Sequence, residues 1–363
     1  MTMWIKQLSL SALLLLTAQT ALAGGVDRSE QSVDFIYDEG SFASASALQI
    51  TPTVTGRDLL TGQNIDNVTP DKVSFSLNLK YDLNDRWAVG LVKDTPYWAT
   101  LKYGTVGTFN SVEALLDSKA ITAMVRFKPW EQLKLMGGVK YQTLSGNVAL
   151  PFANNFTIEI PDSDAWGFVV GAAFEMPEIG LRASLDYHSE VEHSHTRRET
   201  GGTVGCGNQV TTSTTKIPRS YNINVQTGIA KNTLLFGSAR FAQYSKFKVR
   251  AFCLSEASLT NYDNSEDYML GIGHRFDNGL SASLAYKWRN SSDYDPTGSP
   301  LTPTNGQKIY SLGLRYQFEK VELSGSVGKF SFGDDGAGLG NTQIATFEGN
   351  DAIFGALKVK VNF

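Results

Sequence analysis

The sequence predicts an all-β fold, a transmembrane antiparallel β-barrel of roughly fourteen strands in a bacterial outer membrane. Three observations lead to this prediction. The chain opens like a secretory signal peptide, apolar residues alternate with polar ones over many short segments, and short turns alternate with long polar connections.

Residues 1–23 have the order of a signal peptide. Lys6 precedes an apolar stretch from Leu8 to Leu16, and Ala21-Leu22-Ala23 offers a cleavage site. The apolar run is about half as long as a membrane-spanning helix requires, which makes an uncleaved anchor the weaker alternative. No later stretch approaches the roughly 18 uninterrupted apolar residues of such a helix, so membrane contact must come through strands.

The strand pattern is clearest from Val73 to Tyr81, where every second residue is apolar and Ser74, Ser76, Asn78 and Lys80 lie between. Successive side chains of a strand point to opposite faces, so we expect the apolar set to face lipid and the polar set to line the lumen. Similar alternation predicts strands near 47–55, 73–81, 86–93, 121–127, 133–141, 166–174, 181–187, 221–229, 233–248, 268–276, 280–288, 310–318, 321–327 and 353–363.

The connections between these strands differ in length. Long polar segments near 56–71, 94–111, 147–163, 194–216, 251–265, 291–306 and 333–349 alternate with tight turns such as Asp277-Asn278-Gly279. Short periplasmic turns and long outer loops are typical of outer-membrane barrels. The alternative, a soluble sandwich, has no reason to segregate its loops by length.

Composition excludes some partners. A formal net charge of -4, with Lys and Arg spread singly, provides no basic face for nucleic acid. Cys206 and Cys253 of an exported chain predict one disulfide, with two free thiols as the alternative, and neither has the spacing of a metal site. We expect no cofactor.

A histidine-rich stretch contains His188, Glu190, His193 and His195. Neither Gly-x-Ser-x-Gly nor His-Glu-x-x-His frames these residues, so we expect a solvated loop edge. A metal site or an outer-membrane lipase is the alternative, and the prediction is that the protein is not an enzyme and binds no metal.

Residues 24–46 precede the predicted barrel of 47–363 and combine acidic side chains with Phe35, Ile36, Tyr37 and Phe42. A barrel of about fourteen strands leaves a lumen that its own side chains do not fill, so this segment is predicted to be a plug, or hatch. A disordered periplasmic tail is the alternative.

Several stretches of the mature chain resemble the FadL/TodX family of outer-membrane transporters for hydrophobic compounds. They are Arg28-Ser-Glu-Gln-Ser32, Thr69-Pro-Asp-Lys-Val-Ser-Phe75, Tyr81-Asp-Leu-Asn-Asp-Arg-Trp-Ala-Val-Gly90, Asp94-Thr-Pro-Tyr97 and Gly180-Leu-Arg-Ala-Ser-Leu-Asp-Tyr-His-Ser189. The Asn-Pro-Ala run usual in the family's hatch is missing, and Ser41-Phe-Ala-Ser-Ala45 stands near its place.

The resemblance implies a fourteen-stranded barrel with an N-terminal hatch, an apolar pocket in the lumen, and lateral exit through an opening beside a kinked third strand. Here that strand is 86–93, and Gly90 would permit the kink, with an ordinary small lumen-facing residue as the alternative. Phe152 and Phe156, on the loops that correspond to the family's capture groove, are candidate ligand contacts together with Phe35, Ile36, Tyr37 and Phe42.

The predicted function is therefore passive uptake of hydrophobic molecules, with long-chain fatty acids as the first choice. The alternatives are an aromatic-hydrocarbon transporter of the same family and a small-solute porin. Expected partners are outer-membrane lipid, lipopolysaccharide, and the barrel-assembly machinery through the C-terminal strand ending at Phe363. Family resemblance implies a monomer.

Overall fold

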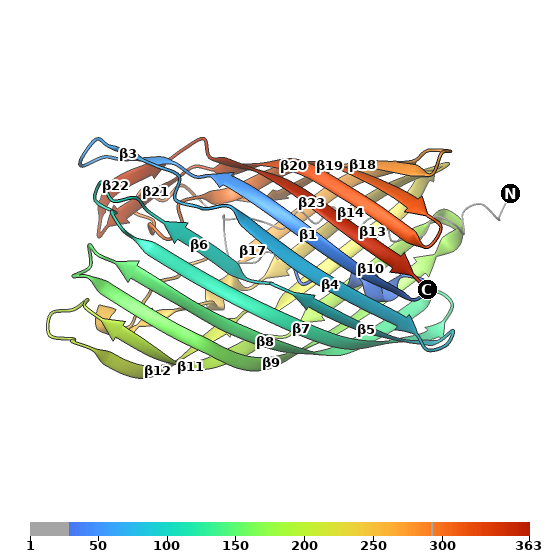
Figure 1. Ribbon diagram of the computed structural model, residues 1–363, viewed down its shortest axis with the longest axis horizontal. Coiled ribbons are helices and arrows are strands. Elements are labelled where there is room, and N and C mark those ends of the chain that lie inside the picture. The colour runs from blue at the N-terminus through green and yellow to red at the C-terminus, as the bar shows by residue number, and fades with distance from the viewer. Residues whose placement is uncertain (1–28, 292) are drawn as a thin grey trace.

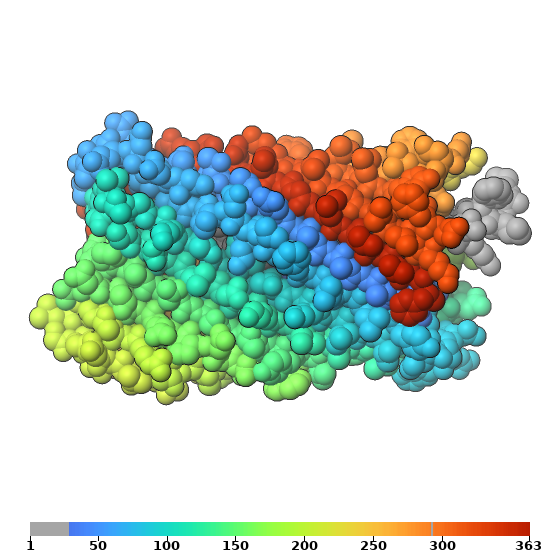
Figure 2. Space-filling model, viewed as in Figure 1, coloured from blue at the N-terminus to red at the C-terminus, as the bar shows by residue number. Residues whose placement is uncertain are grey.

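The structure is a computed structural model and describes residues 29–291 and 293–363, so the predicted signal peptide and residues 24–28 lie outside the described residues. The predicted fold is confirmed: the chain forms a closed antiparallel barrel of 14 strands (Figure 1). The sheet contains 17 hydrogen-bonded segments because three barrel strands are interrupted. Closure comes from β1, which pairs with both β23 and β4, and Figure 2 shows these strands side by side on the outer face.

The barrel segments are β1 (Phe42–Thr53), β4 (Lys72–Asp82), β5 (Trp87–Asp94), β6 (Trp98–Lys102), β7 (Glu113–Trp130), β8 (Leu133–Leu150), β9 (Phe156–Met176), β10 (Leu181–His188), β11 (Val191–Thr200), β12 (Gln209–Ile217), β13 (Ser220–Ala230), β14 (Thr233–Ala242), β17 (Ser265–Arg275), β18 (Leu280–Arg289), β19 (Asn305–Phe318), β20 (Val321–Gly333) and β23 (Asp351–Asn362). The interrupted strands are β5 with β6, β10 with β11, and β12 with β13.

The predicted alternation sets the two faces of the wall. On β4, Val73, Phe75 and Leu77 are 48%, 68% and 53% exposed, while Ser74 and Lys80 between and beyond them are buried inside. Lipid accepts the apolar side chains, and the lumen accepts the polar ones. The prediction of apolar residues outside and polar residues inside is thus confirmed for this strand.

The two ends of the barrel differ as predicted. Tight turns join β4 to β5, β7 to β8, β9 to β10, β13 to β14, β17 to β18 and β19 to β20 at the end where the chain terminates, with η5 (Pro177–Ile179) in one of them. Short turns mark the periplasmic side, so the opposite end is extracellular. There β2 (Gly56–Asp58), β3 (Asn64–Ile65), β21 (Asp335–Leu339) and β22 (Thr342–Phe347) form a small sheet.

Shorter elements complete that end. They are η6 (Tyr244–Lys246), β15 (Arg250–Ala251), η7 (Phe252–Leu254) and β16 (Ala257–Ser258).

Several strand boundaries differ from the predicted ones. β1 begins at Phe42 rather than near Ala47, and strands occupy most of 147–163 and 194–216, which we expected to be loops. The β12 extension is largely polar on both faces, being rich in Thr and Ser, because its outer face meets water instead of lipid. Without a hydrophobic contrast, period two leaves no signal in the sequence.

No helix in the described ranges is long and apolar enough to cross a membrane.

Candidate functional site

The described residues before β1, Ser29–Ser41, lie inside the barrel, and they are called the hatch below. Their centre is a 3-10 helix, η4 (Asp34–Tyr37), whose four residues are all buried. Phe35, Ile36, Tyr37 and Phe42 pack in one apolar cluster with inward-facing residues of the wall, among them Met124. Four of the predicted ligand contacts thus hold the hatch against the barrel.

Ion pairs fix the periplasmic half of the hatch. Arg182 of β10 lies 2.9 Å from Asp38, 3.8 Å from Asp34 and 2.7 Å from Glu175 of β9, and it donates to the Tyr37 carbonyl. Lys134 of β8 adds contacts of 2.7 Å to Glu39 and 2.8 Å to Glu175. Because Arg182 and Lys134 are buried, their charges require these partners.

The tip of the hatch is bonded to the third barrel strand. Ser29 Oγ donates to Asp94 at 2.5 Å, and the Gln31 amide donates to the Tyr97 hydroxyl. Glu30 and Gln31 both have φ of 52°, in the left-handed region that non-glycine residues rarely adopt. Glu30 is held by an ion pair with Lys287 of β18.

Polar side chains surround the hatch tip on the inner wall. Lys140 Nζ of β8 donates to the side-chain oxygen Oε1 of Gln31 and lies 3.3 Å from His188 Nδ1 of β10. Gln142 follows Lys140 on the same face, and neither its amide nor His188 Nε2 has a hydrogen-bond partner among the described residues. These three buried residues, Lys140, Gln142 and His188, are called the polar band below.

The expectation of a solvated histidine loop edge is wrong. His193 and His195 belong to β11, face the lumen, and are 0% and 6% exposed. His193 Nδ1 lies 3.2 Å from Ser163 Oγ. Within the ranges that the structure covers, no three residues of the types His, Cys, Asp and Glu are grouped to hold a metal ion.

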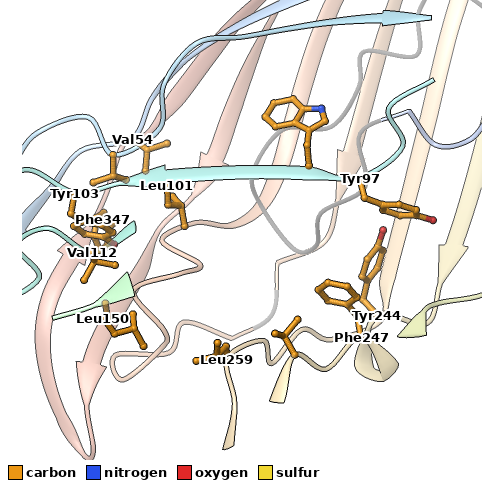
Figure 3. Close-up of a cluster of buried hydrophobic side chains, with 14 of the residues drawn as sticks. Val54, Tyr97, Leu101, Tyr103, Val112, Leu150, Tyr244, Phe247, Leu259 and Phe347 are labelled. Atoms are coloured by element: carbon orange, nitrogen blue, oxygen red, sulfur yellow. The ribbon is translucent and has the colours of Figure 1, made fainter. Parts of the chain in front are cut away.

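Beyond the polar band, the interior becomes apolar. On β8 the next inward residue after Gln142 is Leu144, which belongs to a large buried cluster at the extracellular end (Figure 3). We call it the extracellular apolar cluster. Its larger members are Tyr97, Trp98, Leu101, Tyr103, Phe109, Phe156, Tyr244, Phe247, Phe330, Phe332, Phe347 and Phe354.

The cluster combines strand residues with residues of the extracellular connections. Phe109 lies 6.0 Å from Tyr103 and 5.5 Å from Phe152, measured between ring centroids. Burial raises the pKa of the Tyr103 phenol, which donates to the Pro300 carbonyl at 2.6 Å. Of the predicted contacts, Phe156 is a buried member of the cluster and Phe152 packs against it.

Sequence reasoning missed most of this cluster. Its members come from connections far apart in the chain, and no periodic pattern links Phe109, Phe247 and Phe347. A usable signal was an excess of aromatic residues in segments expected to be polar loops, since exposed aromatics on a loop imply a contact.

The wall has a gap beside the third strand. β4 pairs with β5 only from Leu77, opposite Lys93, whereas β6 pairs with β7 alone. Pro96 lies in the interruption between β5 and β6, and proline removes a donor from the ladder.

Main-chain bonds frame this gap at its upper end. Lys102 N donates to Val68 O at 2.8 Å, and Val68 N donates to Val54 O at 2.9 Å. The gap therefore lies between residues 69–76 and 95–101, and we call it the lateral window. A cavity of about 100 Å³ next to it is lined by hatch residues and by β1, β4, β5 and β23.

Gly90, the predicted kink, lies below the window within β5, where it pairs with Lys80 and Met124 in register. Its absent side chain makes room for the hatch, because a Cβ there would lie 2.6 Å from Ile36 Cδ1. Its role in lateral opening stays a prediction.

Cys206 and Cys253 are joined by a disulfide with their Cα atoms 5.6 Å apart. The bond links the connection after β11 to η7, and Glu199 of β11 accepts the Cys253 amide at 2.8 Å. The extracellular connections are thus fastened to each other over the apolar cluster.

A barrel of this strand number, occupied by an internal segment and roofed by folded loops, defines a plugged outer-membrane channel. The chain belongs to the outer membrane protein transport protein family (OMPP1/FadL/TodX), whose model matches residues 12–328. It is an outer-membrane protein that crosses the membrane through its strands.

Solved structures agree on the fold. A Pseudomonas aeruginosa FadL homologue is similar with a TM-score of 0.74 at 12% identity, covering 95% of this chain and 96% of that one. The Pseudomonas putida toluene transporter TodX gives 0.65 at 11% identity with coverage of 95% and 96%. The Ralstonia pickettii toluene transporter TbuX gives 0.62 at 10% identity with 90% of each chain covered. No curated protein sequence matches the chain.

Proposed function

We propose that this protein takes up hydrophobic molecules across the outer membrane by passive diffusion, and that long-chain fatty acids are its cargo. The observation that carries the proposal is the order of environments along the inner wall. The extracellular apolar cluster leads to the polar band, and the lateral window opens beside both.

An apolar chain gains about 0.8 kcal/mol for each methylene that leaves water, so the cluster offers a favourable first site. A water-filled pore would offer no such gain. Passage then requires displacement of cluster side chains, movement of the hatch tip and release through the window into the lipid. No nucleotide is needed for any of these steps.

The polar band favours fatty acids over aromatic hydrocarbons. A fatty acid has a carboxylate next to its apolar chain, and Lys140, Gln142 and His188 lie directly beyond the apolar Leu144. Buried polar atoms that have no hydrogen-bond partner among the described residues, here the Gln142 amide and His188 Nε2, favour a ligand that brings hydrogen-bonding groups. Toluene, the cargo for which the similar transporters TodX and TbuX are named, has no hydrogen-bonding group.

Mass spectrometry of the purified, folded barrel tests the cargo class. A fatty acid that co-purifies supports the proposal, and a neutral aromatic in its place redirects it to the family's other cargo. In parallel, Phe109→Gln should reduce uptake of a labelled fatty acid at least tenfold, since it brings an amide into the cluster. Phe109→Leu, which keeps the apolar character, is the matched control.

A small-solute porin is the competing function. Steady ion conductance in planar bilayers separates the two, because a lumen occupied by the hatch should conduct little. High conductance of the intact barrel would count against hydrophobic uptake.

A further inference from the structure

A lysine side chain reaches across the lateral window. Lys72 belongs to β4, on the edge that has no partner strand, and its Nζ lies 3.7 Å from Asp117 Oδ1 of β7. The same ammonium lies 5.4 Å from the ring centroid of Trp98 on β6. Lys72 therefore joins the two rims of the gap that the main chain leaves open.

The surroundings make this ion pair unusual. Lys72 alternates along β4 with Val73 and Phe75, which are exposed to lipid, and Trp98 is buried in the extracellular apolar cluster. The side chains of Lys72 and Asp117 are 29% and 34% exposed, which puts them at the rim of the window. Charges in a lipid-facing wall are rare unless they are paired or serve the transport path.

The pair is also weak enough to break. Partly exposed ion pairs change an equilibrium by about fivefold or less, and a cation over a tryptophan face adds a comparable amount. By contrast, Leu77 and Lys93 below the window are joined by the main-chain ladder. Opening at the window thus requires separation of side chains alone.

We propose that Lys72 is a charge-selective strap of the lateral window, an inference that rests on the proposed function. With the window closed, the ammonium is held by Asp117 and Trp98. As cargo leaves, its carboxylate replaces that of Asp117, so one ion pair is exchanged for another of the same chemistry. A neutral molecule offers no such exchange and must pass while the pair is broken without compensation.

Flux through the full-length barrel in liposomes tests this assignment. The probes are a long-chain fatty acid and its methyl ester, which differ in charge and share the same chain. Lys72→Met removes the charge and keeps the length of the side chain, and Lys72→Arg keeps the charge. Lys119→Met, an outward-facing lysine on β7 close to Asp117, is the matched control.

The acid-to-ester flux ratio of Lys72→Met should fall two- to fivefold, while Lys72→Arg and Lys119→Met keep the ratio of the parent. Asp117→Asn should raise the flux of both probes because it loosens the strap without removing the ammonium. An unchanged ratio in Lys72→Met would overturn the proposal. If the parent carries neither probe, the proposed function fails first, and heat-modifiability gels verify that each variant is folded.

Discussion

Replacement of Arg182 by Met should release the hatch. Arg182 is the shared partner of Asp34, Asp38 and Glu175, and its side chain is 3% exposed. Methionine fills a similar volume without a charge. Two hatch carboxylates and one wall carboxylate then lose their common cation inside the lumen.

The expected size of the effect follows from this burial. Removal of one partner from a buried ion pair costs about 3–5 kcal/mol, because the remaining charge stays desolvated. A loss of this size shifts the balance between seated and released hatch by roughly two to nearly four orders of magnitude. Lys134 and Lys360 still contact the hatch acids, which places the effect toward the lower end.

The assay is ion conductance of single barrels in planar bilayers, together with the temperature of heat modification on gels. Arg182→Met should show open events that are absent in the parent. Arg198→Met is the matched control, since Arg198 pairs with Glu159 at 3.7 Å with side chains 57% and 64% exposed. Such an exposed pair contributes about 0–1 kcal/mol.

A double variant tests whether unpaired hatch carboxylates cause the release. Asp38→Asn removes one of the stranded carboxylates, so Arg182→Met with Asp38→Asn should open less often than Arg182→Met alone. If Arg182→Met stays as closed and as stable as Arg198→Met, the ion pairs of Arg182 do not hold the hatch.

Three further predictions concern other parts of the molecule. Gly90→Ala should loosen the hatch by about 1–3 kcal/mol through overpacking against Ile36, seen as added conductance, whereas Gly137→Ala, with open space around its Cβ, should have no effect. Cys206→Ser should speed proteolytic cleavage in the connection that follows β11 and leave heat modification of the barrel unchanged, because the bond joins extracellular segments only; equal cleavage rates would contradict this. Burial opposes the charge of Asp58, but hydrogen bonds from the main-chain amides of Thr108, Thr61 and Leu60 outweigh this effect and lower the pKa of Asp58. The contribution of Asp58 to loop order should therefore persist at neutral pH and be lost as pH falls below the ordinary value near 3.8. Amide hydrogen exchange at Thr108 measures this loss, and Asp58→Asn should show fast exchange at every pH.

The barrel was predictable wherever lipid touches it. On β4 and its neighbours, lipid requires every second residue to be apolar, and that requirement is visible in the sequence as period two. Beyond the membrane the requirement ends. His193 and His195 alternate with Glu192 and Ser194, so both faces of the strand carry polar residues. Nothing in the sequence therefore distinguished the lumen-facing side from the solvent-facing side.

The interior of the lumen was less predictable because its contacts are long-range. The hatch was expected from its length and position, but the pairing of Asp38 with Arg182, 144 residues later, has no local signal. The extracellular apolar cluster likewise joins residues of separate connections. Pro96 is a local marker of the window and lies in the Asp94-Thr-Pro-Tyr97 stretch that resembles the family, whereas the predicted kink was at Gly90.

The proposed route has a thermodynamic consequence that explains why such a channel needs no energy source. An apolar chain gains about 0.8 kcal/mol per methylene when it leaves water for the extracellular apolar cluster. The membrane interior beyond the lateral window offers nearly the same gain, so the step from cluster to lipid is close to neutral in free energy. What remains to be overcome is local: the contacts of the hatch tip, among them the buried Glu30–Lys287 ion pair, and the Lys72 strap, which is weak enough to break thermally. A pocket that bound cargo more tightly would release it more slowly. A cluster whose affinity for apolar chains is close to that of lipid allows both capture and release.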